Sequence, residues 1–368
     1  MEINTLSFGN IFKNKKILIT GDTGFKGSWL AMWLVELGAD VYGYALPPKS
    51  SNDNFIKCKL NEKIKHENGD VRDLSKFKKF FKDIKPEIAF HLAAQSLVLD
   101  SYRDTHCTFD TNIMGTVNFF EAVRETESLK VAINITSDKC YRNNEWIWAY
   151  REIEPMGGND PYSASKGCSE LITASYINSF FSGNDKCCIA SARAGNVLGG
   201  GDWASERIVP DYFRSIAKNE KLILRNPYSI RPWQHVLEPL SGYLMLAWKL
   251  FIEGNDYSGA WNFGPSRDEQ YSVKKLIDEF VDYLGQGQYE IQQSNDGFHE
   301  ANLLGLDISK ALRYLKWKPV LNFRETVEFT VDGYIDERDN KDILYYKRVK
   351  QINQYTEKAK EKEIVWSK

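Results

Sequence analysis

The sequence has almost no excess charge of either sign, because 48 lysines and arginines are balanced by 50 aspartates and glutamates, for a net charge of −2. Nonspecific binding of nucleic acid or of an anionic membrane needs a positive field, so the composition argues against both partners. No apolar run reaches about 18 residues, the length of a membrane-spanning helix, and the N-terminus lacks the apolar core of a signal peptide. We therefore expect a soluble, cytoplasmic protein that binds neither nucleic acid nor a membrane.

Cysteine is also scarce, and its six positions include no CxxC pair and no zinc-binding spacing. A chain of 368 residues can bury a large core and does not need disulfides to stabilise it. The cysteines are therefore predicted to be reduced thiols, and the sequence offers no candidate metal site. Internal repeats and low-complexity linkers are absent as well.

Near the N-terminus, the chain has a glycine-rich turn between a predicted strand at residues 16–20 and a predicted helix at residues 28–37. The glycines follow the spacing G-x-x-G-x-x-G, and their missing side chains permit a tight turn, the approach of a pyrophosphate and close helix packing. Glycines also end strands for ordinary reasons, but the strand-turn-helix context favours a dinucleotide site. The candidate cofactor contacts in this turn are Gly21, Thr23, Gly24, Phe25, Lys26 and Gly27.

The end of the next predicted strand, residues 41–45, leaves the choice between NAD and NADP open. An acidic side chain usually binds the ribose hydroxyls of NAD at this place. Here the chain continues through Leu46 and Pro47 instead, with no acidic residue. No arginine is available for a 2′-phosphate either, although Lys26 or Lys49 could approach one.

Two later segments supply further candidate contacts to the dinucleotide. Asp70 and Val71 follow another possible strand, and Asp70 is a candidate adenine ligand, although the segment Asp-Val-Arg-Asp that it begins could equally be a helix N-cap. A predicted strand at residues 88–92 ends at Leu92 and leads into Ala93 and Ala94, whose small side chains let a dinucleotide pass close above. His91 lies within this strand pattern and is predicted to be packed rather than catalytic.

Further strands are predicted at residues 131–136, 188–193 and 260–264. Strands that alternate with helices indicate an α/β fold with a doubly wound parallel sheet of the Rossmann type. The helical segment at 112–123 carries an apolar stripe that fits a core or a subunit interface. The lysine-, glutamate- and tyrosine-rich segment 336–368 is predicted to be a solvated helix with no assigned role.

The most informative residues are Ser137, Asp138 and Lys139, at the end of one predicted strand, and Tyr162 with Lys166 further along. A tyrosine and a lysine four residues apart share one helix face, so the ammonium is expected to lie beneath the phenol and favour its phenolate. That makes Tyr162 a candidate base near neutral pH, with Ser137 holding the same substrate oxygen. Asp138 and Lys139 are two further proton carriers that simple alcohol oxidation does not need, so a second chemical step is expected.

Cys140 and Tyr141 adjoin these residues but are interpreted as structural, because no histidine partner accompanies the thiol. Substrate contacts are expected instead from the looser segment that follows residue 193. Amide and guanidinium donors suit a substrate diphosphate, although each could equally be a surface residue or a loop anchor. The candidate substrate ligands are Gln95, Asn196, Arg207 and Arg231.

Several motifs together resemble the extended short-chain dehydrogenase/reductase superfamily and, within it, the CDP-glucose 4,6-dehydratase subfamily of the nucleotide-sugar dehydratase/epimerase group. They are GDTGFKGSWL, HLAAQSLV, TNIMGTVNFFEAV, TSDKCY, DPYSASK, RAGNVLGGGDW and RPWQHVLEPLSGYL. The resemblance covers the chain from about residue 12 to residue 330. The glycine and YxxxK motifs occur throughout the superfamily, whereas FKGSW, Ser-Asp-Lys and RPWQHV are more specific.

The resemblance implies bound NAD and a lyase that converts CDP-D-glucose to CDP-4-dehydro-6-deoxy-D-glucose and water. Tyr162, with Lys166 and Ser137, would serve oxidation at C4 by NAD+. The 4-ketone acidifies the C5 hydrogen, water leaves across C5 and C6, and the hydride returns to C6. Asp138 would protonate the departing C6 hydroxyl. The choice of CDP rests on the resemblance alone.

Lys139 departs from the wider 4,6-dehydratases, which have a glutamate in this place as the C5 base. A free lysine is protonated at neutral pH, so Lys139 can act as a base only if burial and the nearby Lys166 cation keep it neutral. An ionised Asp138 beside Lys139 would favour the ammonium instead. Asp138 can be an acid and Lys139 a base at the same time if one proton sits on Asp138 while Lys139 is neutral. We hypothesise that Lys139 removes the C5 proton; the alternative is a lysine that only positions Asp138 or a sugar hydroxyl.

The resemblance also implies a division into two domains. Residues 1–192, with a returning segment at about 236–263, would form an NAD-binding Rossmann domain. Residues 193–235 and 264–368 would form a smaller, mixed α/β domain that binds the nucleotide sugar. Subunits would pair through helices near 112–125 and 162–181 into a homodimer or a dimer of dimers, and the product would serve deoxysugar synthesis for polysaccharide.

Three alternatives stay open. A nucleotide-sugar 4-epimerase shares the fold, the cofactor and the Tyr162/Lys166 pair but has no use for Asp138 and Lys139. A dehydratase for another nucleoside-diphosphate sugar would share all of these residues. A noncatalytic NAD(P)-sensing regulator would be expected to lose the tyrosine or the lysine, and here both are present.

Overall fold

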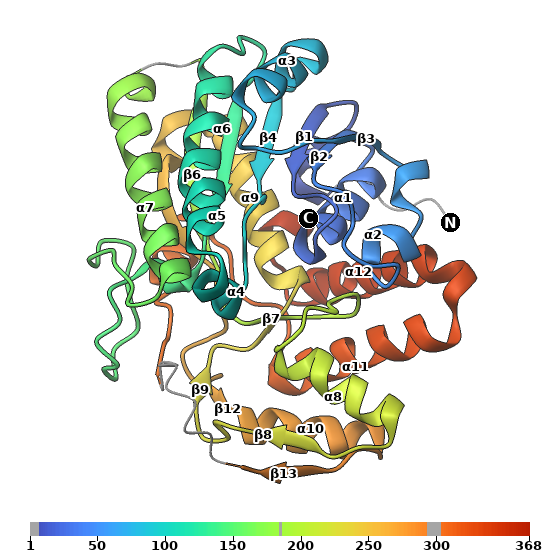
Figure 1. Cartoon of the computed structure of the whole chain (residues 1–368). Coiled ribbons are helices and arrows are strands. Elements are labelled where there is room, and N and C mark those ends of the chain that lie inside the picture. The colour runs from blue at the N-terminus through green and yellow to red at the C-terminus, as the bar shows by residue number, and fades with distance from the viewer. Residues whose placement is uncertain (1–6, 184–185, 293–302) are drawn as a thin grey trace.

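A computed structural model describes residues 7–183, 186–292 and 303–368. At its centre lies a seven-stranded sheet, all of whose strand pairs are parallel, in the order β11-β6-β5-β4-β1-β2-β3 (Figure 1). The strands are β1 (Lys16–Thr20), β2 (Asp40–Ala45), β3 (Lys65–Asn68), β4 (Ile88–His91), β5 (Val131–Ile135), β6 (Cys188–Arg193) and β11 (Gly259–Asn262). The predicted Rossmann sheet is therefore confirmed, and β1 and β6 have the predicted bounds.

Helices cover both faces of this sheet, as a doubly wound fold requires. On one face, α1 (Phe25–Glu36) and α9 (Leu237–Glu253) bury an apolar core that includes Trp29, Leu240 and Leu244. On the other face, α3 (Leu74–Ile84), α6 (Gly115–Arg124) and α7 (Pro161–Tyr176) bury a second core. Phe77, Phe119 and Phe120 contribute large aromatic side chains to it.

The strand order reverses between β1 and β4, which pair with each other while their following segments diverge. Ligands of open α/β sheets bind at such a reversal, outside the carboxyl ends of the strands. The turn after β1 and the Ala93 segment after β4 both lie at this edge. The topology therefore brings the predicted cofactor residues together.

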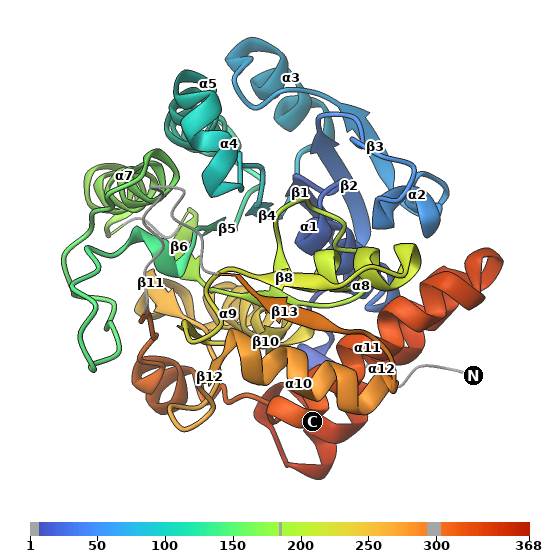
Figure 2. The same ribbon diagram turned by 60° about the horizontal axis from the view of Figure 1, so that its bottom comes forward.

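A smaller lobe lies below the sheet in Figure 1 and comes forward in Figure 2. It contains α8 (Ile208–Lys218), α10 (Val273–Leu284), α11 (Phe323–Asp339) and three two-stranded pairs. The pairs are β7 (Val197–Leu198) with β10 (Gln234–His235), β8 (Leu222–Leu224) with β13 (Tyr289–Ile291), and β9 (Ile230–Arg231) with β12 (Tyr271–Ser272). Its own apolar core includes Tyr212, Phe280 and Val331.

The remaining helical elements are short except for α12 (Leu344–Glu361). They are α2 (Asn54–Lys57), α4 (Val98–Arg103), α5 (Thr105–Phe109), and the 3₁₀ or π turns Ser7–Asn10, Leu60–Glu62, Asp110–Met114, Asp138–Cys140, Ile177–Phe181, Gly254–Tyr257, Ala311–Leu315, Lys341–Ile343 and Val365–Ser367. Within the described ranges, no helix is long and apolar enough to cross a membrane.

The prediction of a solvated C-terminal helix is wrong. One face of α12 is buried, with Arg348 and Tyr355 fully enclosed, and the helix packs against α1 of the sheet layer. Trp366 stacks on Phe8 at 4.9 Å between ring centroids and on Tyr355 at 5.8 Å. Composition failed here because a helix rich in lysine and glutamate can still bury one stripe of large side chains. The predicted domain boundaries stay a prediction, and α12 contacts elements on both sides of them.

Candidate active site

The glycine-rich turn after β1 is shaped by close backbone contacts. A Cβ on Gly27 would lie 2.1 Å from the carbonyl oxygen of Gly21, and a Cβ on Gly21, whose φ is +75°, would lie 2.8 Å from the amide nitrogen of Ala93. Helix α1 then begins at Phe25 after Gly24, which supplies no side-chain cap. The turn thus leaves the N–H groups of the first helical turn available to an anion.

Beneath the turn lies a buried pair that sequence reasoning missed. Asp22 is fully buried, and its Oδ2 lies 2.7 Å from Nδ1 of His66 on β3. Burial raises the pKa of Asp22, although the contact with His66 works against the rise. Burial opposes protonation of His66, but the hydrogen bond and charge of Asp22 raise its pKa overall. The two residues are far apart in sequence, so no motif joins them.

Lys26, within the turn, is half-buried. Its pKa is lowered to about 8 by burial and by the charges of Lys166 and Arg207, while Asp138 opposes the shift. The turn, the catalytic helix and the predicted substrate loop therefore share one electrostatic environment. Three cations against one carboxylate make this environment suited to an anionic ligand.

The candidate cofactor residues Thr23, Asp70 and Val71 each make different contacts in the structure. Thr23 donates its hydroxyl to the carbonyl of Leu46 at 3.0 Å, across the end of β2. Asp70 forms an ion pair with Arg72, and the hydrogen bonds from Arg72 lower the pKa of the Asp70 carboxyl. The N-cap of α3 is Asp73, the last residue of the Asp-Val-Arg-Asp segment, so this segment does supply a helix N-cap, as the alternative expected. Val71 is buried.

After β4, the backbone N–H groups of Leu92 and Ala93 both donate to Oγ1 of Thr20 at 3.1 Å. Ala94 follows them at the sheet edge, half-buried. Gln95 turns inward: its amide donates to the carbonyl of Leu97 at 2.9 Å and to Oγ1 of Thr108 at 3.0 Å. In this structure, Gln95 therefore shapes the turn that follows the cofactor segment.

His91 is packed, as predicted. Its ring stacks on Phe119 at 4.6 Å, and its Nδ1 lies 2.8 Å from Oγ1 of Thr20. Burial lowers its pKa to about 3, so the ring is neutral at physiological pH.

The predicted catalytic triplet forms a single turn at the carboxyl end of β5. Ser137 caps the 3₁₀ turn Asp138–Cys140, because its Oγ accepts the N–H of Lys139 at 3.3 Å. The same hydroxyl donates to Oδ1 of Asp138 at 2.9 Å. Asp138 is buried, and no described residue bonds its Oδ2. A Cβ on Gly195 would lie only 1.9 Å from that oxygen, so a glycine is needed to leave the carboxyl its space.

Tyr162 and Lys166 lie on α7, which begins at Pro161 and is capped by Asp160 through the N–H of Ser163 at 2.9 Å. Both side chains are buried. The triplet and the pair are brought together, because a hydrogen bond with Ser137 contributes to the pKa of Tyr162. Lys166 directs its Nζ to the carbonyl of Ile135 at 3.5 Å.

The expected activation of Tyr162 by Lys166 is not found among the protein groups alone. Burial raises the pKa of Tyr162 to about 12, and Asp138 raises it further, against the opposing effects of Ser137 and Arg207. Burial also lowers the pKa of Lys166 to about 8. The reason is desolvation, which penalises the phenolate and the ammonium alike. Additional positive charge is needed before Tyr162 can act as a base near neutral pH.

Lys139 meets the condition of burial only in part, since its side chain is half-buried. Its Nζ has no hydrogen-bond or ion-pair partner among the described residues. Among the residues that the structure describes, the Lys139 side chain therefore supports no other group.

A buried ion pair behind the triplet was also missed. Glu170, one turn after Lys166 on α7, bonds Arg193 of β6 at 2.6 Å. It also accepts hydroxyl donors from Thr136 and from Ser191, the latter at 2.7 Å. Burial opposes ionisation, but Arg193 holds the pKa of Glu170 below its usual range. An arginine inside an otherwise apolar strand was the signal that a buried partner exists.

Cys140 and Tyr141 have the structural roles predicted for them. Cys140 is fully buried, and burial raises its pKa well above the usual value, so it is not a reactive thiolate. The hydroxyl of Tyr141 donates to Oδ1 of Asn262 at 2.7 Å and accepts from Arg193 at 2.6 Å.

Three of the four predicted substrate ligands lie after β6, whereas Gln95 follows β4. Arg207, just before α8, is partly exposed and pairs with Asp202 at 2.9 Å, and its charge reaches both Tyr162 and Lys26. Asn196 has a strained φ of +42°, and its carbonyl accepts the N–H of Gln234 at 3.2 Å. Arg231 lies on β9 in the smaller lobe, half-buried. Arg207 is thus the candidate that the structure brings to the catalytic turn.

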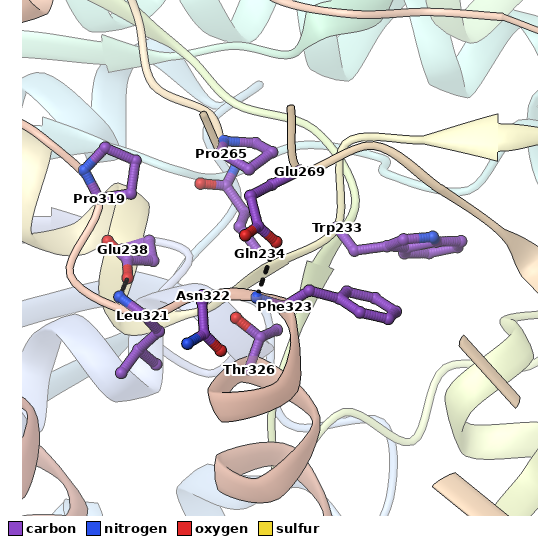
Figure 3. Close-up of a pocket in the computed structure, with 10 residues that line it drawn as sticks. All are labelled: Trp233, Gln234, Glu238, Pro265, Glu269, Pro319, Leu321, Asn322, Phe323 and Thr326. Carbon is purple, nitrogen blue, oxygen red and sulfur yellow. Dashed lines mark hydrogen bonds between the residues drawn. The ribbon is translucent and has the colours of Figure 1, made fainter. Parts of the chain in front are cut away.

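A cavity at the start of α11 is not the substrate site. Figure 3 shows the side chains around it, with Glu238 bonded to the N–H of Leu321 and Glu269 to the N–H of Phe323. Its volume of about 10 Å³ suffices for a single water molecule. Among the described residues, no group of three or more histidine, cysteine, aspartate or glutamate side chains could hold a metal ion.

Comparison with known proteins places these residues in context. Residues 18–330 match the family model described as GDP-mannose 4,6 dehydratase. The CDP-glucose 4,6-dehydratase of Salmonella typhimurium is 48% identical over 322 residues, which cover 86% of this chain and 90% of the relative.

Solved structures show the same fold at lower identity. The epimerase Mth375 of Methanothermobacter thermautotrophicus superposes with a TM-score of 0.78 at 22% identity, covering 93% of this chain and 97% of that chain. The dTDP-glucose 4,6-dehydratase of Bacillus anthracis, solved in complex with NAD, gives a TM-score of 0.73 at 18% identity, covering 90% and 99%.

Proposed function

Because the chain belongs to the GDP-mannose 4,6-dehydratase family, we propose that it is the member that converts CDP-D-glucose to CDP-4-dehydro-6-deoxy-D-glucose and water. The observation that carries this proposal is Asp138. It is a buried carboxyl whose Oδ2 is unbonded among the described residues, in the same turn as Lys139 and beside Tyr162. Oxidation alone gives such an acid no task, whereas loss of a hydroxyl requires one.

The residues of the glycine-rich turn fit NAD as the cofactor. The uncapped start of α1 and Lys26 suit its pyrophosphate, and Gly21 and Gly27 leave no side chain in its way. When bound, NAD+ supplies the hydride acceptor for the C4 hydrogen and the hydride that returns to C6. We assign Asp70, Val71, Leu92, Ala93 and Ala94 to the contacts along its path.

In the first half of the reaction, Tyr162 takes the proton of the C4 hydroxyl while Ser137 hydrogen-bonds the same oxygen. With its pKa near 12, the phenol needs nearby positive charge for this task. Arg207 already lowers that pKa, and Lys166, one helical turn away, is placed to add its ammonium when it is protonated.

In the second half, the 4-ketone makes the C5 hydrogen acidic, and water is lost across C5 and C6. Asp138, in its protonated form, gives its proton to the departing C6 hydroxyl, and Lys139, as the neutral amine, takes the C5 proton. Lys139 suits this role because its Nζ is not committed to a partner among the described residues. The ammonium formed on Lys139 exchanges its protons with solvent and later returns one of them to C5.

The diphosphate of the substrate is assigned to Arg207, with Arg231 and Asn196 on the smaller lobe. Gln95, whose amide is bonded to Leu97 and Thr108, is assigned to the sheet edge beside the substrate only as the support of its own turn. We also propose two domains: residues 1–192 and 236–263 bind the cofactor, and residues 193–235 and 264–368 bind the nucleotide sugar. Charge supports this division, because Arg207 stands within reach of the electrostatic environment of Tyr162 and Lys26.

A nucleotide-sugar 4-epimerase is the second candidate, because epimerases share this fold, as Mth375 does. Asp138 and Lys139 favour the dehydratase, since a 4-epimerase needs neither residue. A dehydratase acting on another nucleoside-diphosphate sugar is distinguished from the proposed one only by its base, and a noncatalytic regulator would have no need of the intact Tyr162 and Lys166.

Purified protein incubated with CDP-glucose is expected to form a 4-keto-6-deoxy sugar, observed by NMR, both with and without added NAD+. UDP-, GDP- and dTDP-glucose serve as matched substrates. Turnover of one of these in preference to CDP-glucose would show that cytosine is the wrong nucleobase. Formation of an epimerised sugar would contradict the dehydratase activity. Unchanged sugar with all four, even with NAD+ supplied, would contradict the whole proposal.

Lys139→Ala tests the assignment of the C5 base. In D₂O, wild-type protein incorporates deuterium at C5 of the product, and the variant is expected to lose at least about 10²-fold in this exchange. Lys139→Gln, which keeps most of the length of the side chain, should behave alike. Exchange at the wild-type rate in both variants would leave Lys139 as a residue that only positions Asp138 or the sugar.

We also propose a homodimer or dimer of dimers, paired through α6 and α7. Exposed apolar side chains follow this side of the molecule: Met114, Leu171 and Phe180 are 46%, 60% and 45% exposed. Light scattering is expected to give at least twice the mass of the chain. Leu171→Glu should shift the mass towards one chain, and a single-chain mass for the wild type would contradict the proposal.

A further inference from the structure

The segment from Gly199 to Arg207, here called the 199–207 loop, is fixed by residues that lie far from it in sequence. It carries Arg207, whose charge reaches Tyr162. Three glycines, Gly199, Gly200 and Gly201, begin the loop, and all three lie against other side chains. A Cβ on Gly200 would lie 2.3 Å from Nη1 of Arg348, and a Cβ on Gly201 would lie 2.6 Å from Cγ of Asn54.

Arg348, on α12, is fully buried where four elements meet. Its Nη1 donates to the carbonyl of Gly333 on α11 at 2.8 Å, and its Nε donates to Oδ1 of Asn54 on α2 at 3.3 Å. The guanidinium also lies 5.3 Å from the ring centroid of Trp29 on α1. Trp29 in turn donates its Nε1 to the carbonyl of Gly200 at 2.9 Å. The start of the loop is therefore held between α1 and α12.

Glu337, on α11, completes the arrangement. Its Oε2 accepts from Nη2 of Arg348 at 3.1 Å, and its Oε1 accepts from Nε1 of Trp203 at 2.5 Å and from Nζ of Lys57 at 2.6 Å. The Glu337 side chain is 2% exposed, so the acceptor end of each of these bonds is shielded from water, and its bond to Arg348 is enclosed on both sides. The middle of the loop is thus tied to the same buried ion pair.

The loop passes this constraint on to Arg207. Tyr334 donates its hydroxyl to the carbonyl of Asp202, and the carboxylate of Asp202 holds Nη1 of Arg207 at 2.9 Å. An uninterrupted series of contacts therefore runs from the C-terminal helix to the guanidinium beside Tyr162. Glu337 and Arg348 both lie beyond residue 330, where the match to the family model ends.

We propose that Glu337 and Arg348 are positioning residues for the substrate diphosphate: this buried pair sets the 199–207 loop, and through it Arg207, for binding of the nucleotide sugar. The inference rests on the proposed function and deepens it. It gives the C-terminal segment a task at the site, although neither residue touches substrate. Its signature is a change in substrate binding with the reacting groups left in place.

Trp203→Phe is the gentlest test, because it removes the bond to Glu337 and keeps an aromatic ring. KM for CDP-glucose is expected to rise about tenfold, since small displacements of a binding group have effects of this size. The kcat and the amount of NAD retained on purification should stay close to wild type. Glu337→Gln should act in the same direction, and Arg348→Lys should restore part of what Arg348→Met loses.

Tyr355→Phe is the matched control. Tyr355 lies on α12, the helix that carries Arg348, and it does not contact the loop. The variant loses the buried hydrogen bonds of the tyrosine hydroxyl to Glu238 and Ser241, at 2.9 and 3.0 Å. Its melting temperature should fall while its KM stays at the wild-type value. Equal KM values for Trp203→Phe and Tyr355→Phe would overturn the proposal.

Hydrogen exchange without substrate provides a measurement that does not depend on the reaction. Amides of the 199–207 loop should exchange faster in Trp203→Phe and Glu337→Gln than in wild type and in Tyr355→Phe. Unchanged loop exchange would overturn the positioning role even if the wild type dehydrates CDP-glucose. If the wild type turns over no sugar, the proposed function fails, whereas faster loop exchange would still support the buried pair as the support of the loop.

Discussion

Two buried glutamate–arginine pairs support the two halves of the candidate site, and they do so in different ways. Glu170 and Arg193 lie within α7 and β6, the elements next to the catalytic turn, at 2.6 Å. Glu337 and Arg348 lie on α11 and α12, at 3.1 Å, and reach a loop more than a hundred residues earlier in the chain. The first pair joins the sheet to the helix of the proposed reacting groups Tyr162 and Lys166, whereas the second contacts the loop that we propose positions the substrate.

The difference indicates which step of the reaction a displacement of each pair would affect. A shift of Glu170 moves Lys166, one turn away, and the strand end that carries Ser137. A shift of Glu337 moves Trp203 and leaves the sheet unchanged. We therefore expect perturbation of the first pair to act mainly on kcat and perturbation of the second mainly on KM.

The largest effect is expected within the catalytic edge itself, for Tyr162→Phe. Loss of the phenolic proton acceptor should lower kcat by about 10³-fold, with little change in stability, because only one hydroxyl is removed. Steady-state assays and thermal unfolding measure both quantities.

Tyr141→Phe is the matched variant, because its hydroxyl is equally buried but bonds only Arg193 and Asn262. It should cost about 1–3 kcal/mol of stability and leave kcat near wild type. If Tyr141→Phe lowered kcat as strongly as Tyr162→Phe, the distinction between chemistry and support at this edge would fail.

Next in size is the exchange of each glutamate for glutamine. Glu170→Gln leaves Arg193 as an uncompensated buried charge and should cost about 3–5 kcal/mol of unfolding free energy. Glu337→Gln should cost less, because two of its three donors are partly exposed side chains. Chemical denaturation gives the energies, and kinetics should show the kcat effect for Glu170 alone. Identical kinetic profiles would remove the contrast between the pairs.

Gly195→Ala should have a smaller, purely local effect. The new methyl group would come within 1.9 Å of Oδ2 of Asp138, so the carboxyl must move. A loss of about tenfold in kcat is expected. Gly264→Ala, where φ is likewise not positive and the nearest side-chain atom would lie 3.5 Å away, controls for the loss of a glycine. Full activity of Gly195→Ala would argue against Asp138 as the acid.

The smallest effect concerns pH and the Asp22–His66 pair under the cofactor turn. Both pKa values are raised in the folded protein. A raised pKa means stabilisation that is present below the unfolded value, about 6.5 for histidine, and is lost as the pH rises through the folded value. As the pH rises from about 6.5 through the folded pKa of His66, the melting temperature of the wild type should therefore fall. The melting temperature of His66→Gln should fall less over the same pH range. An equal slope in both proteins would contradict the pairing.

Much of the fold could be predicted from sequence because parallel strands buried on both faces appear as short apolar runs. The runs at 16–20 and 188–193 became β1 and β6 with the expected bounds. The sequence could also single out Tyr162, Lys166 and the Ser137 turn, because each is a local motif, and their catalytic roles stay a prediction.

What sequence could not show are contacts between distant residues. His66 meets Asp22, Arg193 meets Glu170 and Arg348 meets Glu337 only after the chain has folded. The C-terminal helix was misread for this reason: its lysines and glutamates describe the exposed face, while its buried stripe depends on partners in α1 and α11. The raised pKa of Tyr162 likewise follows from burial, which spacing alone does not reveal.

The 3₁₀ turn Asp138–Cys140 has a consequence for protein engineering. The two residues assigned to elimination occupy neighbouring codons, and Ser137, which caps the turn, is encoded just before them. A single short mutagenic cassette over three codons therefore samples every combination of hydroxyl, acid and base at this site. Such a library would measure how few genetic changes separate a water-eliminating enzyme from one that only oxidises or epimerises its sugar.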